Sequence, residues 1–187
     1  MNAPTKPMTG EDFIDWCQKQ PRGRFELVEG EIVGMAAERA LHRQVKHRLA
    51  IALEHAISVA GVPCHFEPDG ATVRISEHTA FEPDALVYCG AELPDDSVIV
   101  PEPIIVCEVL SPSTAQADVG RKLTGYFKVP SLQHYLIIDP ESRGVIHHQR
   151  LADGSIRTLM LSDGALTLTP PGLAVPLTAI FPAARKT

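Results

Sequence analysis

The segment PIIVCEVLSPSTAQADVGRKLTGY, residues 103–126, decides the fold that we predict for this chain. From Ile104 to Leu110 it forms a short, mostly β-branched run, typical of a central strand that is buried on both faces. Glu108 interrupts this run, and an ionised carboxylate there is costly to desolvate unless it is paired, protonated or bound to a cation. We therefore expect Glu108 to belong to a polar site built into a sheet.

A helix is predicted directly after this strand. The sequence SPST ends the strand, Ser113 or Thr114 supplies an N-cap, and residues 115–128 form the helix. Asp118 and Lys122 are four residues apart, so they share one face of that helix. Because sites in α/β sheets collect at the carboxyl ends of strands, we expect this face to lie near the buried carboxylate.

Length and composition indicate one α/β (α+β) domain spanning residues 1–187, with its core at about 24–161 and a flexible tail at 1–8. The hydrophobic fraction of 44% is ordinary for a globular protein. No run approaches the ~18 apolar residues that cross a bilayer, and the N-terminus lacks the apolar core of a signal peptide. The sequence thus predicts a cytoplasmic protein with no membrane partner.

The formal net charge of −6 repels a polyanion over the surface as a whole. Any contact with nucleic acid must therefore be local and basic, or assisted by metal ions and a partner subunit. Four cysteines, at positions 17, 64, 89 and 107, show neither CxxC pairing nor the spacing of a metal site. We expect all four to be reduced thiols packed as small hydrophobic residues.

The N-terminal third predicts a helix, a hairpin and a second helix. Thr9 is an N-cap for a helix that ends near Gln18, and RFELVEGEIVGM, residues 24–35, forms two alternating strands around Glu29-Gly30. Glu26 lies on the first of these strands. The pattern leaves open whether Glu26 is a solvated strand residue or a carboxylate of the site.

The second helix covers about residues 37–60. Its apolar stripe comprises Leu41, Val45, Leu49, Ala52, Leu53, Ala56 and Ile57. His42 falls within this stripe and is either a core histidine or a residue of the site. The first half of the helix also carries the most basic part of the chain, with Arg39, Arg43, Lys46, His47 and Arg48. That face is either solvated or contacts phosphate.

Further strands follow along the chain. Pro83-Asp84 precedes the apolar segment 85–88, which places Asp84 at the entrance of a strand. We also predict a strand at 135–139, a hairpin formed by 144–150 and 156–161, and a closing strand from residue 166 with a turn at 170–172. His147 and His148 are not expected to bind a metal together, because adjacent strand residues point to opposite faces.

These residues form a constellation suited to phosphodiester hydrolysis. Asp84 and Glu108 on neighbouring strands can hold Mg²⁺ or Mn²⁺ through hard oxygen ligands. Such a metal lowers the pKa of a bound water and neutralises charge on the phosphate. Lys122 can orient the water or stabilise the transition state.

The motifs also resemble those of a known family. In order they are FELVEGEIV (25–33), a helix carrying His42, PDALV (83–87), IVCEVLSPST (105–114), then Asp118, Lys122, Tyr126 and PSLQHYLIIDP (130–140). Together they resemble the Uma-type bacterial restriction endonucleases, of the PD-(D/E)xK nuclease superfamily. The resemblance covers residues 25–140 and extends to the Leu/Pro-rich end.

The resemblance implies a restriction-endonuclease-like fold, a mixed sheet flanked by helices, and an endonuclease that cuts DNA with Mg²⁺ or Mn²⁺. It makes Asp84 and Glu108 metal ligands, adds the carbonyl of Val109, and gives Glu26 the place of a supporting acid. It also places His42 in the site and implies a homodimer.

One departure from the superfamily pattern is that Leu110 stands where the strand lysine of ExK would be. Lys122 on the following helix then takes the role of that lysine. Asp118 would either support Lys122 or form a surface ion pair with it.

Two other functions remain open from the residues alone. The chain could be a catalytically inert nuclease-fold module that binds nucleic acid or a protein partner, which the net charge and Leu110 favour. It could also hydrolyse small phosphate esters with a metal. Metal binding at Asp84 and Glu108 disfavours the inert module, and turnover of small diesters without DNA affinity would indicate the second.

Overall fold

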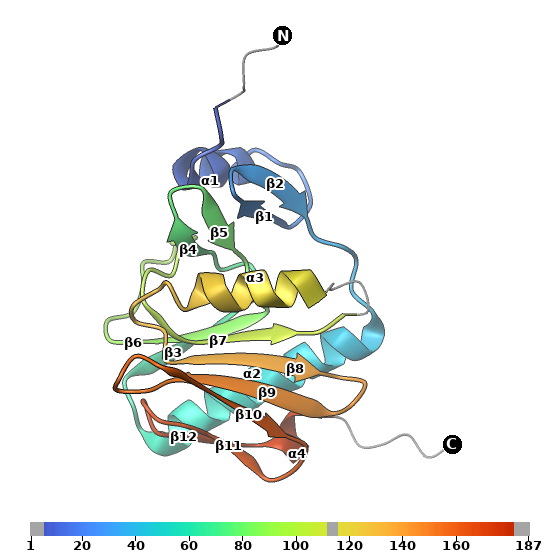
Figure 1. Ribbon diagram of the computed structural model, residues 1–187, viewed down its shortest axis with the longest axis vertical. Coiled ribbons are helices and arrows are strands. Elements are labelled where there is room, and N and C mark those ends of the chain that lie inside the picture. The colour runs from blue at the N-terminus through green and yellow to red at the C-terminus, as the bar shows by residue number, and fades with distance from the viewer. Residues whose placement is uncertain (1–5, 112–115, 182–187) are drawn as a thin grey trace.

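The computed structural model describes residues 6–111 and 116–181, apart from the side chains of 116–118. Six strands form the main sheet in the order β10-β9-β8-β7-β6-β3 (Figure 1). Their bounds are β3 Cys64–Pro68, β6 Ala85–Cys89, β7 Pro103–Val109, β8 His134–Asp139, β9 Gly144–Arg150 and β10 Ile156–Leu161. Only β7 and β8 pair in parallel in this sheet. The sheet is therefore mixed, as the sequence predicted, and β7 lies inside it.

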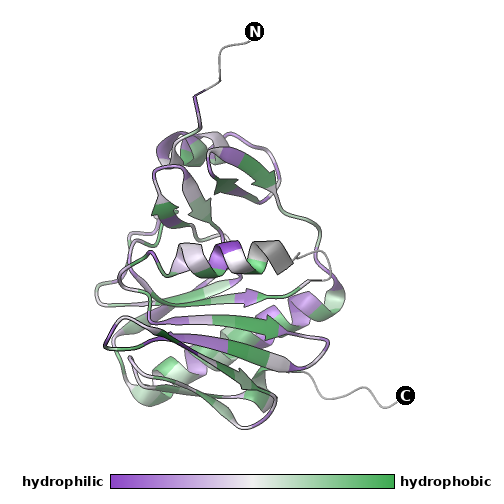
Figure 2. Ribbon diagram, viewed as in Figure 1, coloured by the Kyte–Doolittle hydropathy of each residue, from purple (hydrophilic) through white to green (hydrophobic). Residues whose placement is uncertain are grey.

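Alternation along the strands separates two apolar faces. On one face, Ile105 and Cys107 of β7 join the core cluster that includes the apolar stripe of α2 (Ala40–Ala60). On the other face, Val106 packs in the cluster that contains Tyr126 of α3 (Gln116–Tyr126). The two helices accordingly cover opposite sides of the sheet, whose strands carry much of the hydrophobic colour in Figure 2. Glu108 shares the alternation of Val106 and faces α3.

The long helix α2 buries the apolar stripe that the sequence predicted. α2 begins at Ala40, three residues later than expected, and ends at Gly61, whose φ of 62° is the left-handed conformation that suits glycine at this position. Val45, Leu49 and Leu53 are fully buried. The 3.6-residue period was thus sufficient to orient this helix.

A second, smaller sheet lies beside α3 (Figure 1). Its order is β2-β1-β5-β4, with bounds β1 Phe25–Val28, β2 Glu31–Gly34, β4 Val73–Ser76 and β5 Thr79–Phe81. Glu29 and Gly30 both have positive φ, 52° and 84°, which is the two-residue turn expected for this hairpin. Helix α1 (Gly10–Gln18), capped by Thr9, packs Phe13 against Leu27 and Ala80.

The C-terminal segment closes the side of the sheet that α2 covers. β11 (Ala165–Leu168) and β12 (Leu173–Pro176) form a hairpin, and α4 (Leu177–Ile180) follows directly. Leu166, Leu168, Leu173 and Val175 are buried in the same core cluster as α2. Within the described part of the chain, no helix is long and apolar enough to cross a membrane.

The expectation of four reduced cysteines is wrong for two of them. Cys64 and Cys89 are cross-strand partners of β3 and β6 and form a disulfide. The sequence could not reveal this pair, because it depends on the register of two strands 25 residues apart. Cys107 is a free buried thiol, as expected, and Cys17 is a free thiol that is only half-buried.

The two adjacent histidines of β9 have separate partners. His147 Nε2 lies 2.9 Å from His134 Nδ1, whereas His148 Nδ1 lies 2.8 Å from the hydroxyl of Thr158. They point apart, as the alternation of a strand predicts.

The predicted N-cap at Ser113 or Thr114 lies outside the described residues.

Candidate functional site

Asp84 and Glu108 lie side by side because of how β6 and β7 pair. Ala85 is opposite Cys107 in this antiparallel pair, so the same register places Asp84 beside Glu108. The amide of Asp84 donates to the carbonyl of Cys107 at 3.1 Å. In return, the amide of Val109 donates to Oδ2 of Asp84 at 2.7 Å. The Pro-Asp pair thus supplies a buried carboxylate that the backbone of the neighbouring strand orients.

Lys122 reaches this pair from α3. Its Nζ lies 2.9 Å from Oε1 of Glu108 and 2.9 Å from Oε1 of Glu26. Tyr126, one helical turn later, donates its hydroxyl to the same oxygen of Glu108 at 2.7 Å. Two side chains of one helix face therefore fix Glu108.

Glu26 comes from the small sheet and is buried, so it is not a solvated strand residue. Its Oε1 accepts a hydrogen bond from the amide of Glu82 at 3.1 Å, besides the contact with Lys122. Lys122 consequently bridges a carboxylate of the small sheet to one of the main sheet.

Burial and charge shift the protonation equilibria of this pair in different ways. The pKa of Glu108 is raised to about 7, first by burial, which Lys122 opposes and the charges of Asp84 and Glu26 reinforce. Burial alone would lower the pKa of Lys122, but Glu108 and Glu26 outweigh it and hold that pKa above the ordinary lysine value. Lys122 is therefore a fixed positive charge, whereas Glu108 exchanges its proton near neutrality.

His42 belongs to the apolar stripe of α2 and also contacts the site. Its Nε2 lies 2.7 Å from the carbonyl oxygen of Val109, to which it donates, and 3.7 Å from Oδ2 of Asp84. Its Nδ1 faces Oε2 of Glu38, one turn earlier, at 3.3 Å. His42 is therefore buried on the core face of α2 and also lies against the carboxylates. Its role in the site stays a prediction.

Lys46 is a member of the site that the sequence analysis placed only on a basic helix face. Its Nζ lies 2.9 Å from Oδ1 of Asp84, 2.7 Å from Glu38 and 2.8 Å from Asp69. Burial would lower the pKa of Lys46, but these carboxylates outweigh it and raise that pKa. The available signal was its position four residues after His42, which puts both residues on one face of α2.

Arg24 extends the same ionic network toward the small sheet. Its NH1 lies 2.8 Å from both Glu38 and Asp69, and its Nε pairs with Glu82. Burial raises the pKa of Glu38, but Lys46, His42 and Arg24 outweigh it and lower that pKa. This network joins residues from four separate segments, so no local motif predicts it.

These groups open into a cavity of about 250 Å³. Its lining includes Glu26, Glu38, His42, Asp84, Glu108, Val109, Leu110 and Lys122. Leu110 thus lies at the cavity that Lys122 enters from α3, so the helix lysine supplies the positive charge that the strand position lacks. The side chain of Asp118 is outside the described part, and its pairing with Lys122 stays a prediction.

The residues of this cavity fit a hard divalent cation. Among the described residues, no group of three or more His, Cys, Asp or Glu side chains is arranged to hold a metal. Mg²⁺, however, is commonly bound by one or two carboxylates together with waters and substrate phosphates. Asp84, Glu108 and the second lone pair of the Val109 carbonyl are such oxygen donors. Burial first, and then the charges of Asp84 and Glu26, raise the pKa of Glu108, and a cation bound beside it would favour the ionised carboxylate.

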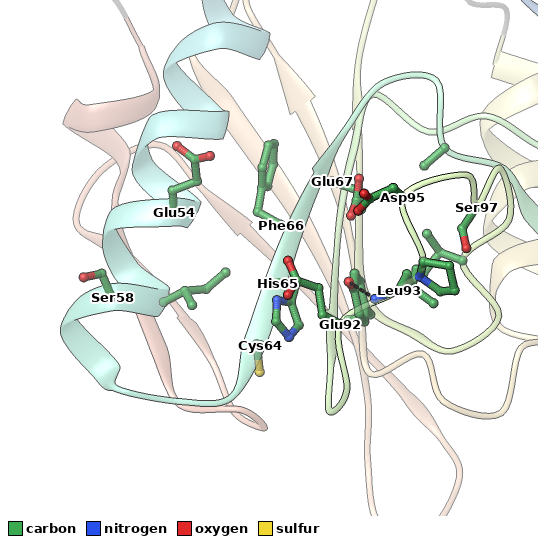
Figure 3. Close-up of a pocket in the computed structure, with 15 residues that line it drawn as sticks. Glu54, Ser58, Cys64, His65, Phe66, Glu67, Glu92, Leu93, Asp95 and Ser97 are labelled. Carbon is green, nitrogen blue, oxygen red and sulfur yellow. Dashed lines mark hydrogen bonds between the residues drawn. The ribbon is translucent and has the colours of Figure 1, made fainter.

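A larger hollow of about 530 Å³ is lined by β3, the second half of α2 and the segment that follows β6, and none of these residues lines it (Figure 3). Its acidic lining residues are Glu54, Glu67, Glu92 and Asp95, and none of its lining residues is Lys or Arg. Such a lining repels phosphate groups. We therefore assign the candidate site to the smaller cavity.

Comparison of the sequence with known proteins gives a match to one family model and to two relatives. A family model described as "Uma2: Putative restriction endonuclease" matches residues 11–179. The Synechocystis sp. protein sll1609 is 30% identical over 155 residues, covering 81% of this chain and 85% of that protein. A second protein of that organism, slr1290, is 27% identical over 183 residues, covering 96% and 94%.

A similar fold is known from a crystal structure. The Anabaena variabilis ATCC 29413 protein described as "a putative nuclease belonging to DUF820" superposes with a TM-score of 0.75 and 17% identity. The match covers 94% of this chain and 98% of that chain. The expected nuclease-like fold is thereby confirmed.

Proposed function

We propose, because this chain belongs to the Uma2 family of restriction endonucleases, that it is a metal-dependent endonuclease that hydrolyses DNA phosphodiester bonds. The observation that carries this proposal is the pair of Asp84, directly before β6, and Glu108 on β7, with Lys122 held 2.9 Å from Glu108. Two carboxylates and a fixed ammonium in one cavity are what phosphodiester hydrolysis requires.

Each residue has a distinct part in this proposal. Asp84, Glu108 and the Val109 carbonyl would hold Mg²⁺ or Mn²⁺, which would supply an activated water and neutralise phosphate charge. Lys122 stays protonated, so it orients the water or stabilises the developing charge and does not act as a base. Glu26 holds Lys122 in place, and His42 orients the Val109 carbonyl.

We further propose that the protein works as a homodimer, since cutting both strands of a duplex calls for two such sites. Sedimentation equilibrium with and without duplex tests this. If the protein stays monomeric in both conditions, the homodimer proposal is wrong, and we would expect each protein molecule to cut only one strand of a duplex.

The main test is plasmid nicking beside calorimetric titration of Mg²⁺ and Mn²⁺. We expect metal binding and nicking in the parent protein, and loss of both in Asp84→Asn and Glu108→Gln. The matched control is Glu67→Gln, which removes a carboxylate from the hollow in Figure 3 and should behave as the parent. Parent-like nicking by both site variants would refute the site assignment.

Lys122→Met separates catalysis from metal binding. Because it removes a positive charge beside the carboxylates, we expect metal affinity to be retained or raised while nicking falls about 10²- to 10³-fold, the usual loss for a residue that stabilises the transition state. A parent that neither binds metal nor turns over plasmid or small diesters would instead indicate the inert nuclease-fold module.

A further inference from the structure

The first half of α2 has a charge opposite to that of the whole chain. Residues 39–53 contain Arg39, Arg43, Lys46 and Arg48 but no Asp or Glu, in a chain of net charge −6. A polyanion that avoids most of this surface is attracted to such a segment. The position of this segment relative to the carboxylates decides whether it can serve the site.

Three hollows run from the carboxylates along α2 and share lining residues. The site cavity shares Glu38 and Asp84 with a second hollow of about 310 Å³. The second hollow shares His47 with a third, of about 390 Å³. A continuous recess therefore runs along α2 from Asp84 to a point past the middle of the helix.

Exposed side chains line this recess. Arg43 borders the second hollow, His47 borders the second and third, and Arg48 borders the third; all three are exposed. Lys46, between them, is instead turned inward to Asp84. Arg43 and His47 are one helical turn apart, about 6 Å along the axis. We call Arg43, His47 and Arg48 the α2 track.

We propose that the α2 track is the surface on which DNA lies, with Arg43 and Arg48 contacting phosphates that flank the one cut at Asp84 and Glu108. This proposal rests on the proposed function and adds where the substrate runs. Contacts with phosphate fix register and orientation without reading sequence. The track therefore positions a strand and gives no preference among base sequences.

Charge complementarity favours DNA as the occupant. The hollow of Figure 3, beside β3 and the second half of α2, is instead lined by four carboxylates. Phosphates would be repelled there, whereas the recess along α2 offers guanidinium groups that pair with phosphate oxygens. Of these two hollowed regions, only the recess along the first half of α2 carries arginines that can pair with a polyanion.

The test uses DNA binding without cleavage. Anisotropy of a fluorescent 30-base-pair duplex is titrated with Glu108→Gln protein at pH 8, without divalent metal, over a range of salt concentrations. The track variant adds Arg43→Gln and Arg48→Gln, both exposed positions where glutamine keeps helix propensity. The matched control adds Arg22→Gln and Arg157→Gln, which removes the same charge from exposed residues before β1 and on β10.

Each phosphate contact contributes about −0.9 to the slope of log K against log salt for a duplex. We expect the track variant to bind about 10- to 100-fold more weakly at 0.1 M salt, with a slope smaller by about 2. The control variant should have the same slope of log K against log salt as the Glu108→Gln protein. A single strand of the same length should show the same ranking with a shallower slope, about −0.7 for each contact.

Equal binding by the track variant and its background, or an equal loss in the control, would overturn the track while leaving the endonuclease proposal intact. Absence of any DNA binding in the background protein would overturn both. A track variant that binds weakly, beside a parent that never nicks, would support the track and refute the proposed activity.

Discussion

The ammonium of Lys46 lies 2.9 Å from Oδ1 of Asp84, while that of Lys122 lies 2.9 Å from Oε1 of Glu108. Each of the two adjacent carboxylates therefore has its own lysine, one from each helix that covers the sheet. Since α2 and α3 lie on opposite faces, the site is held from both sides at once.

Replacing Lys46 by methionine should destabilise the protein. The substitution removes the lysine from Asp84 and leaves Glu38 and Asp69 with Arg24, and breaking a buried ion pair costs about 3–5 kcal/mol. We expect about 2–4 kcal/mol, because Asp69 is partly exposed and can be hydrated. Urea unfolding measures this. The exposed Lys128→Met should change stability by less than about 0.5 kcal/mol, and a similar loss in both variants would contradict the prediction.

Tyr126→Phe should weaken metal binding without touching a ligand. The hydroxyl of Tyr126 is buried and holds Oε1 of Glu108, and losing a partner that orients a ligand typically costs 10- to 100-fold in metal affinity. Calorimetry with Mn²⁺ measures the effect. Tyr88→Phe is the control, since its hydroxyl only accepts from the amide of Leu93 at the distant hollow. Unchanged affinity in Tyr126→Phe would show that Glu108 needs no such support.

Glu108 should make the metal-free protein less stable as pH rises. Its pKa is about 7 in the folded protein against the ordinary value of 4.5, so the folded state binds more protons between these values. The stabilisation from that proton is complete below about 4.5 and is lost as pH rises through 7. The loss should be of the order of 2–3 kcal/mol. Urea unfolding from pH 5 to 8 should show this decline in the parent and a flatter profile in Glu108→Gln.

The disulfide between Cys64 and Cys89 should add stability through loop closure. Its sequence separation is 25 residues, for which the loss of unfolded-state entropy corresponds to about 3 kcal/mol. We expect Cys64→Ser/Cys89→Ser, or the parent in dithiothreitol, to unfold at correspondingly lower urea. Cys17→Ser is the control for loss of a thiol alone. Equal stability with and without reductant would contradict this prediction.

Local patterns were enough to find the carboxylates of the main sheet. An acid inside an apolar run and a Pro-Asp pair before another run placed Glu108 and Asp84 on strands that proved to be neighbours. The hairpin at Glu29-Gly30 and the stripe of α2 were equally local, because turn conformation and helical period depend on adjacent residues. Lys122 was expected near Glu108 from its place on the helix that follows β7, although its actual distance from Glu108 depends on how α3 docks.

The features that the sequence missed depend on long-range docking. Lys46 is a site residue only because Asp69 and Asp84, from separate segments, converge on it. Glu26 was already a candidate by the family resemblance, but its strand pattern left its burial open, because that burial and the contact with Lys122 depend on how the small sheet docks. The Cys64–Cys89 pair likewise depends on the register of β3 and β6.

The contact of Lys122 with both Glu26 and Glu108 means that the site straddles two independently hydrogen-bonded sheets. Neither sheet contains all residues of the candidate site, so the geometry of that site depends on the docking of the two sheets. A substitution far from the carboxylates, such as one that loosens Phe13 from Leu27, would then disturb the candidate site while every residue around the carboxylates stays unchanged. For the proposed endonuclease, assembly of the two sheets is a precondition of activity, and their interface is a point at which that activity is lost.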